Sequence, residues 1–156
     1  MENKELVRLP FVIPNAGGKH EILLAQALPE SELFRICSIP AFVYGVGLDD
    51  EVRLLEDETF DLVRRGGNVT VRLYIRGSLE RPDIKELLDD IVALDGAYEV
   101  GRQAGEASAT SLLLCSLPLS AGFSRIESLF KPFETGDDQW EYGNVYDAAG
   151  NPLNWW

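Results

Sequence analysis

A glycine turn beside several arginines is the stretch of sequence whose residue types best suit ligand binding. Gly66 and Gly67 follow Arg65 directly, and the strand that comes next carries Arg72. The backbone N–H groups of such a turn, together with guanidinium groups, bind carboxylates and phosphates. The stretch lacks the lysine and threonine of a phosphate-binding loop. The pattern therefore favours a structural turn, and its alternative is a small-anion site made of Arg65, Gly66, Gly67 and Arg72.

Acidic residues form three short runs that place negative charge on turns. Carboxylate oxygens bind hard cations such as calcium, but none of the runs has the ligand spacing of a calcium-binding loop. Solvated turns explain them better, and exposed carboxylates also suit contact with a basic protein. The residues that we expect to supply this charge to a partner are Asp49, Asp50, Glu56, Asp57, Glu58, Asp137 and Asp138.

The remaining chemistry-bearing residues give little support for catalysis. His20 is the only histidine, so a Ser-His-Asp triad or a Cys-His pair would have to use it, yet it stands at a turn. Cys37 and Cys115 lie in apolar runs, which is typical of buried cysteines without a disulfide. One histidine and two cysteines fall a ligand short of a four-coordinate zinc site. We therefore expect no catalytic residue, no metal and no cofactor.

The elements before the glycine turn are short strands. Two apolar runs separated by a turn at residues 14–18 predict a hairpin. A third run ends at Pro40, and residues 41–46 are read as a short extension of it. Two more strands with tight turns follow, so residues 1–66 are expected to form a small bent β-sheet or partial barrel. The five runs are Leu6 to Ile13, Glu21 to Leu28, Leu33 to Ile39, Glu51 to Glu56 and Thr59 to Arg65.

The strand after the turn alternates more strictly than any other. Its apolar face carries Val69, Val71, Leu73 and Ile75, and its polar face carries Thr70, Arg72, Tyr74 and Arg76. Two arginines and a tyrosine on one face suit the binding of carboxylates or phosphates. Salt bridges to acidic residues of neighbouring strands are the better explanation of the same face.

Residues 67–146 predict a ferredoxin-like β-α-β-β-α-β half, so the whole chain is expected to be α+β. Pro82 begins the first helix, and Gly96 closes it in the left-handed conformation. Strands over residues 98–103 and 111–117 follow, the second of them central. A capping box at residues 124–127 opens a second helix, and Pro132 ends that helix or lies in its frayed last turn. The last strand covers residues 139–146 and carries Trp140.

Residues 147–156 have turn composition and end in Trp155 and Trp156, which either fold back on the body or dock on another chain. We expect the three segments to form one compact unit. No apolar run approaches the roughly 18 residues of a membrane span, and the start lacks a signal-peptide pattern, so we expect a cytoplasmic protein that contacts no membrane.

The 156-residue chain carries a formal net charge of -12 at pH 7. This charge argues against a nucleic-acid partner, because phosphate binding needs clustered cations. It favours encounter with a basic partner, although an acidic surface also serves solubility alone.

Three stretches resemble a bacterial family of uncharacterised proteins, domain-of-unknown-function family 4265. They are the proline-aromatic segment at residues 39–42 with the turn at 45–52, the run at residues 65–72, and Trp140-Glu141-Tyr142. Gly66 stands where the family usually has serine, and Asn68 where it usually has histidine. The resemblance covers the chain from the third strand to about Tyr146. It implies a shared fold and no particular activity.

These observations together favour a non-enzymatic binding protein. Small size, strong negative charge and acidic turns are typical of a bacterial immunity or antitoxin-type inhibitor that covers a basic toxin domain. Either Trp140 or the terminal tryptophans, Trp155 and Trp156, are expected to anchor the contact. The alternative is a small-anion sensor or enzyme that uses Arg65, Gly66, Gly67 and Arg72. A structural subunit of a larger assembly is a third interpretation.

Overall fold

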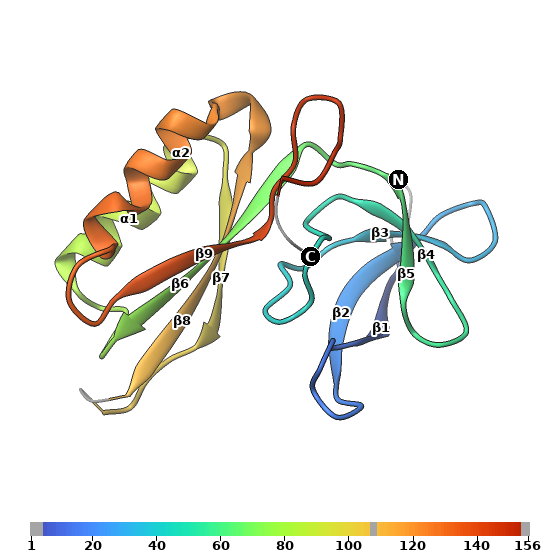
Figure 1. Cartoon of the computed structure of the whole chain (residues 1–156), viewed down its shortest axis with the longest axis horizontal. Coiled ribbons are helices and arrows are strands. Elements are labelled where there is room, and N and C mark those ends of the chain that lie inside the picture. The colour runs from blue at the N-terminus through green and yellow to red at the C-terminus, as the bar shows by residue number, and fades with distance from the viewer. Residues whose placement is uncertain (1–4, 107–108, 154–156) are drawn as a thin grey trace.

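Two antiparallel β-sheets lie side by side, and two helices cover one of them (Figure 1). The structure is a computed structural model, and it describes residues 5–106 and 109–153. The mixed α+β class predicted from the sequence is confirmed. The first sheet contains β1 (Leu6–Val12), β2 (His20–Ala27), β3 (Leu33–Ile36), β4 (Glu51–Leu54) and β5 (Phe60–Arg64). The second part contains β6 (Asn68–Arg76), α1 (Pro82–Ala93), β7 (Ala97–Arg102), β8 (Thr110–Pro118), α2 (Phe123–Phe130) and β9 (Gln139–Asn144), with short 3₁₀ helices at Leu119–Ala121 and Lys131–Phe133.

The first sheet has the order β1-β2-β3-β4-β5, so each strand pairs with its neighbour in sequence. The predicted hairpin is confirmed, because β1 and β2 pair from Leu6 with Gln26 to Val12 with His20. The sheet curls until its first strand meets the β4–β5 turn. There the Val12 N–H donates to the Glu58 carbonyl oxygen at 3.1 Å. Phe11, Leu23, Ile36 and Val52 are among the buried residues on its inner side.

The predicted extension of the third strand is wrong. β3 ends at Ile36, and residues 37–50 form a long loop. The N–H groups of Ala41, Phe42 and Val43 donate to the carboxylate of Glu21 in β2 instead of to another strand. This loop, residues 37–50, passes between the two sheets.

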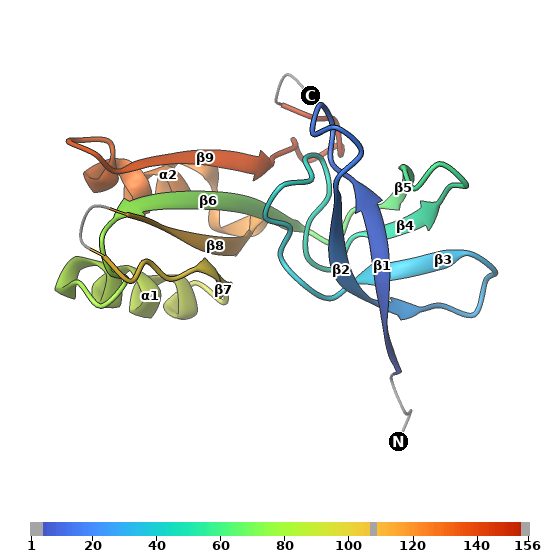
Figure 2. The ribbon, with the colours of Figure 1, turned by 90° about the horizontal axis from the view of Figure 1, so that it is seen from below.

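The second sheet has the order β7-β8-β6-β9, and both helices pack on the same face of it (Figures 1 and 2). Val69, Val71, Leu73 and Ile75 are fully buried beneath the helices, as the alternation predicted. β8 lies between β7 and β6, which confirms its predicted central place. The opposite face of the sheet meets the loop of residues 37–50.

The end of α1 and the start of α2 differ from the sequence prediction in detail. The left-handed residue after α1 is Asp95, with φ 62°, rather than Gly96. Gly96 comes next and donates its N–H to the Ile91 carbonyl oxygen at 2.9 Å, which completes a Schellman-type end. A Cβ on Gly96 would lie 2.7 Å from the Ser116 carbonyl oxygen, so close packing explains this glycine.

The predicted capping box does not form. Gly122 is the N-cap residue of α2, and Ser124 lies inside the helix. The Glu127 carboxylate accepts a hydrogen bond from the Tyr142 hydroxyl at 3.0 Å rather than from the helix end. The 3₁₀ turn containing Pro132 directly follows α2, in agreement with the predicted end of that helix.

The chain after β9 turns back on itself. The Asp147 N–H donates to the Asn151 carbonyl oxygen, and the Leu153 N–H donates to the Val145 carbonyl oxygen at 3.0 Å. Trp155 and Trp156 lie outside the described residues, so their predicted role stays a prediction. Among residues 5–106 and 109–153, no helix has both the length and the apolar character needed to cross a membrane.

Candidate binding cleft between the two sheets

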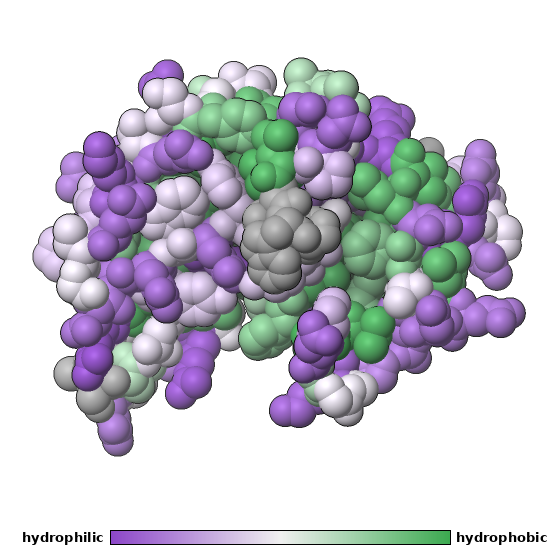
Figure 3. Space-filling model, in the orientation of Figure 1, coloured by the Kyte–Doolittle hydropathy of each residue, from purple (hydrophilic) through white to green (hydrophobic). Residues whose placement is uncertain are grey.

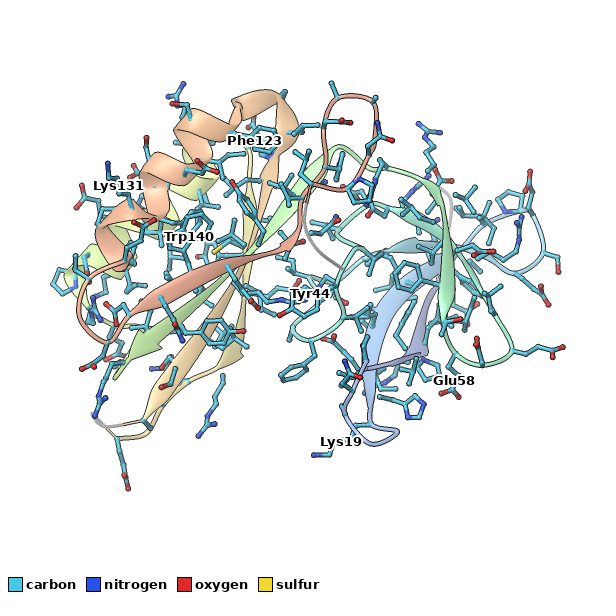
Figure 4. The ribbon with its side chains drawn as sticks, in the orientation of Figure 1. Lys19, Tyr44, Glu58, Phe123, Lys131 and Trp140 are labelled. Atoms are coloured by element: carbon cyan, nitrogen blue, oxygen red, sulfur yellow. The ribbon has the colours of Figure 1, made fainter. Side chains whose placement is uncertain are left out.

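Arg72 joins the two sheets from the centre of the molecule. Its side chain is 1% exposed, although it belongs to the polar face of β6. The guanidinium donates to the carbonyl oxygens of Pro40 at 3.3 Å and Val43 at 2.5 Å. It also lies over the ring of Tyr44, 4.4 Å from its centre. Figure 4 shows Tyr44 between the two halves, where this contact holds the loop against the second sheet.

Two carboxylates hold the same loop by its N–H groups. Glu21 accepts from Ala41 at 2.6 Å, and also from Phe42 and Val43, at 2.9 and 3.0 Å. Glu99 in β7 accepts from Ile39 at 2.6 Å, and burial raises the pKa of Glu99. The loop is thus fixed by one sheet through Glu21 and by the other through Arg72 and Glu99.

A cleft of about 440 Å³ opens beside this loop. Its walls come from three parts of the chain: the turn of the first hairpin, the loop, and the outer face of β6. Phe42 is 55% exposed at the cleft. Such exposure is unusual for an aromatic side chain whose own backbone is fixed in place. Figure 3 shows hydrophobic surface near the lower middle of this face. The lining residues are Ile13, Pro14, Asn15, Ala41, Phe42, Tyr44, Arg72 and Tyr74.

Glu141 in β9 lies beside the cleft, in a neighbouring cavity that shares Tyr44 and Tyr74 with it. Its Oε1 accepts hydrogen bonds from the hydroxyls of Tyr44 at 2.7 Å and Tyr74 at 3.1 Å. Arg72 Nη1 lies 3.6 Å from the same oxygen. Burial, together with the nearby Glu141 carboxylate, raises the pKa of Tyr44 and raises that of Tyr74 to about 12. Both tyrosines therefore stay protonated at neutral pH and keep donating to Glu141.

Asp50 forms a second polar cluster at the end of the loop. Its side chain is fully buried and accepts the N–H of Gly47 at 2.9 Å and the N–H of Gly66 at 2.7 Å. Asn144 donates to it at 3.4 Å, and Arg65 Nη1 lies 3.7 Å away. Burial raises the pKa of Asp50 to about 6, because desolvation outweighs these contacts.

The residues of the predicted anion site bind groups of this chain. The Gly66 N–H and the Arg65 guanidinium both face Asp50, so the turn does bind an anion, and that anion is intramolecular. Arg65 also lies over the Tyr146 ring, 4.3 Å from its centre. Arg72 serves the loop instead, and the structure does not place it with the glycine turn. Gly67 has φ 89° and open space around its Cα, as a turn residue has.

The acidic residues of the predicted charged face do not lie together. The turn with Glu56, Asp57 and Glu58 belongs to the first sheet, whereas Asp137 and Asp138 lie at the far end of the second (Figure 1). Ion pairs join Asp137 to Arg76 and Asp138 to Arg81. Glu58 contacts His20. Asp49 is exposed, but Asp50 is fully buried and therefore cannot touch a partner.

Trp140 is half-buried in the second sheet rather than presented as an exposed anchor. Its ring packs 5.6 Å from that of Phe130 and 5.2 Å from that of Tyr142, measured between ring centres. Its Nε1 donates to Glu134 at 3.0 Å. Within the described residues, no cluster of three or more histidine, cysteine, aspartate or glutamate side chains could hold a metal.

Sequence reasoning missed Phe42, Tyr44, Glu21 and Glu141 as site residues. The sequence does contain a signal for this site. Two aromatic residues lie in the segment after Pro40, and residues typical of turns flank that segment. Aromatic residues in a fixed loop suit contact with a partner better than an apolar strand does. The prediction of a strand extension over this segment hid that signal.

Replacing Gly66 with alanine should destabilise the protein by about 2 kcal/mol, and Gly67→Ala by about 1 kcal/mol. A Cβ on Gly66 would lie 2.4 Å from the backbone of Asp49, which cannot move without disturbing Asp50. At Gly67 the cost comes from the positive φ alone. Urea unfolding of the two variants measures the difference, and equal losses would contradict the close approach at Gly66.

Comparisons with known proteins give a family and a fold. A family model described as "Domain of unknown function (DUF4265)" matches residues 21–142. A search of curated proteins finds no match. The chain is similar to a solved structure described as "Novel crystal structure of a hypothetical protein from Neisseria gonorrhoeae", with a TM-score of 0.67 and 21% identity, over 95% of this chain and 99% of that one. This likeness shows the fold alone. Because the family model covers most of the chain, the protein belongs to the DUF4265 family of unknown function.

Proposed function

We propose that this chain is a non-enzymatic binding protein of the cytoplasm, and that it acts as an immunity or antitoxin-type inhibitor of a basic toxin domain. The observation that carries the proposal is the aromatic cleft between the two sheets of a protein with a net charge of -12. Phe42, Tyr44 and Tyr74 belong to the residue types that carry binding energy in protein interfaces.

The cleft is held ready for a partner. Glu21, Glu99 and Arg72 fix the backbone of the loop that carries Phe42 and Tyr44. A loop fixed in this way loses little conformational entropy when a partner binds. This supports a site used for tight, specific binding.

Charge around the cleft favours a basic partner. The carboxylates of Glu21, Glu99 and Glu141 contact the loop or its tyrosines, and the Arg72 guanidinium lies 3.6 Å from Glu141 Oε1. The remaining negative charge attracts a cationic surface, and the charge of the whole chain speeds the encounter. The acidic turns need not share one face for this long-range effect.

The alternative, a small-anion sensor or enzyme at Arg65, Gly66, Gly67 and Arg72, gains less support. An incoming anion would have to displace Asp50 from the Gly66 N–H and from Arg65. In the cleft, the tyrosine pKa values are raised away from neutrality, which does not favour acid–base catalysis there.

We also propose the finer fold assignments. The order β7-β8-β6-β9, with both helices on one face, supports a ferredoxin-like half over residues 67–146. The Val12 to Glu58 hydrogen bond supports a partial barrel over residues 1–66. The polar contacts across the loop support a single compact unit, and the hydrogen bond from Arg65 Nε to the Gly150 carbonyl oxygen supports including the tail predicted over residues 147–156, of which residues 154–156 lie outside the described part of the chain.

The test of function is neutralisation by co-expression. The candidate partner is the basic product of a toxin-like gene next to this one. Cells that express it with this chain should grow, and cells that express it alone should not. Affinity capture of the tagged chain should recover the same partner at low salt and less of it at high salt. Growth arrest that persists with both proteins present would reject the inhibitor function.

A further inference from the structure

We propose that the cleft receives the guanidinium group of an arginine side chain of the partner, between the Tyr74 ring and the Glu141 carboxylate. This inference rests on the proposed function and names the chemical group that the cleft recognises.

The Glu141 carboxylate is both fixed and reachable. Two tyrosine hydroxyls hold Oε1 in place, and the side chain is still 36% exposed. It lines a second cavity of about 280 Å³ with Tyr44, Tyr74, Gln139 and Trp140. A carboxylate offers about four acceptor positions on its two oxygens, so Glu141 can accept further hydrogen bonds.

Arg72 shows that these groups accommodate a guanidinium. From the buried side it lies 4.4 Å from the centre of the Tyr44 ring and 3.6 Å from Glu141 Oε1. Tyr74 lines both cavities, and its hydroxyl donates to the same carboxylate. An incoming guanidinium would therefore repeat, on the open side, the combination of ring and carboxylate that Arg72 uses.

The charges around the cleft favour a cation, and the geometry favours arginine over lysine. The carboxylates of Glu21, Glu99 and Glu141 bind the loop or its tyrosines, and Arg72 pairs with Glu141, so one further positive charge is attracted rather than repelled. A planar guanidinium stacks on an aromatic ring and donates in a fork to a carboxylate, whereas an ammonium group does neither as well. Phe42 at the cleft adds apolar surface for the aliphatic part of the arginine side chain.

The test uses two small probes of nearly the same shape, one with a charged guanidinium group and one with a neutral urea group. N-acetyl-arginine amide is titrated into the ¹⁵N-labelled full chain, and N-acetyl-citrulline amide serves as its neutral analogue. We expect saturable shifts of the backbone amides of Phe42, Tyr44 and Glu141 with the arginine probe. The citrulline probe should bind at least about tenfold more weakly.

Glu141→Gln should weaken the binding of the arginine probe to the affinity of the citrulline probe. The amide oxygen of the new glutamine side chain can still accept hydrogen bonds from both tyrosines. Glu127→Gln is the matched control, because Glu127 also accepts a tyrosine hydroxyl but lies on α2, outside the cleft. Equal binding of the two probes, or no shift at the cleft with either, would overturn the arginine subsite.

The two proposals fail separately. If a basic partner is neutralised and binding depends on Phe42, but the arginine probe causes no shift at the cleft, the inhibitor function stands and the subsite is rejected. If the arginine probe binds through Glu141 but no partner is neutralised, the subsite stands and the inhibitor function is rejected.

Discussion

Replacing Arg72 with methionine should destabilise the protein by about 3 to 5 kcal/mol, the cost of removing one partner from a buried charged network. The substitution leaves the carbonyl oxygens of Pro40 and Val43 without their donor and leaves Glu141 without its nearest guanidinium. Methionine fills much of the volume, so lost polar contacts cause most of the effect. Urea unfolding followed by circular dichroism measures it.

Arg76→Met is the matched control for this change. Arg76 lies on the same strand, but it is exposed and pairs with an exposed residue, Asp137. Its loss should therefore change the free energy of unfolding by less than about 0.5 kcal/mol. Similar losses at Arg72 and Arg76 would mean that Arg72 does not join the two sheets.

Asp50→Ala should cost about 3 kcal/mol at neutral pH. It leaves the buried N–H group of Gly47 and the N–H group of the more exposed Gly66 without an acceptor, and it leaves Arg65 without its carboxylate. Each unsatisfied N–H group costs about 1 to 3 kcal/mol, and relief of the desolvation of Asp50 offsets part of this. Asp61→Ala is the control, because Asp61 is an exposed aspartate of the same sheet.

The effect of Asp50→Ala should also depend on pH. Burial raises the pKa of Asp50 from 3.8 to about 6, so between these values the folded protein binds a proton that the unfolded chain does not. The pH-dependent part of the stability that Asp50 contributes is therefore complete below about pH 4 and is lost as the pH rises through about 6, while the hydrogen bonds to Gly47 and Gly66 still contribute at neutral pH. The difference in unfolding free energy between wild type and Asp50→Ala should shrink over this interval. A difference that grows with pH would contradict the raised pKa.

The regular elements were predictable because local patterns determine them. The alternation from Val69 to Ile75 needs a sheet with one covered face, and the turn at residues 14–18 brings two apolar runs together. Pro82 favours the start of a helix at this position, whatever surface the helix packs against. The left-handed position at Asp95 was not predictable from glycine preference, because Gly96 is needed for close packing against Ser116.

The site was less predictable because distant residues create it. Alternation placed Arg72 on the polar face of β6, and no local pattern reveals that the loop covers this face. The loop avoids strand geometry because Glu21, about 20 residues earlier, takes its N–H groups. The anion that binds the Gly66 turn is the side chain of Asp50. No pattern in the sequence indicates that Asp50 and Gly66 contact each other.

The dissociation constant between the purified chain and its basic partner tests the central claim most directly. It should be measured for wild type, for Phe42→Ala and for Val100→Ala, since Phe42 and Val100 are almost equally exposed, at 55% and 56%. We expect Phe42→Ala to weaken binding at least about tenfold and Val100→Ala to leave it unchanged. Wild-type affinity in a correctly folded Phe42→Ala variant would contradict a binding site in the cleft between the sheets.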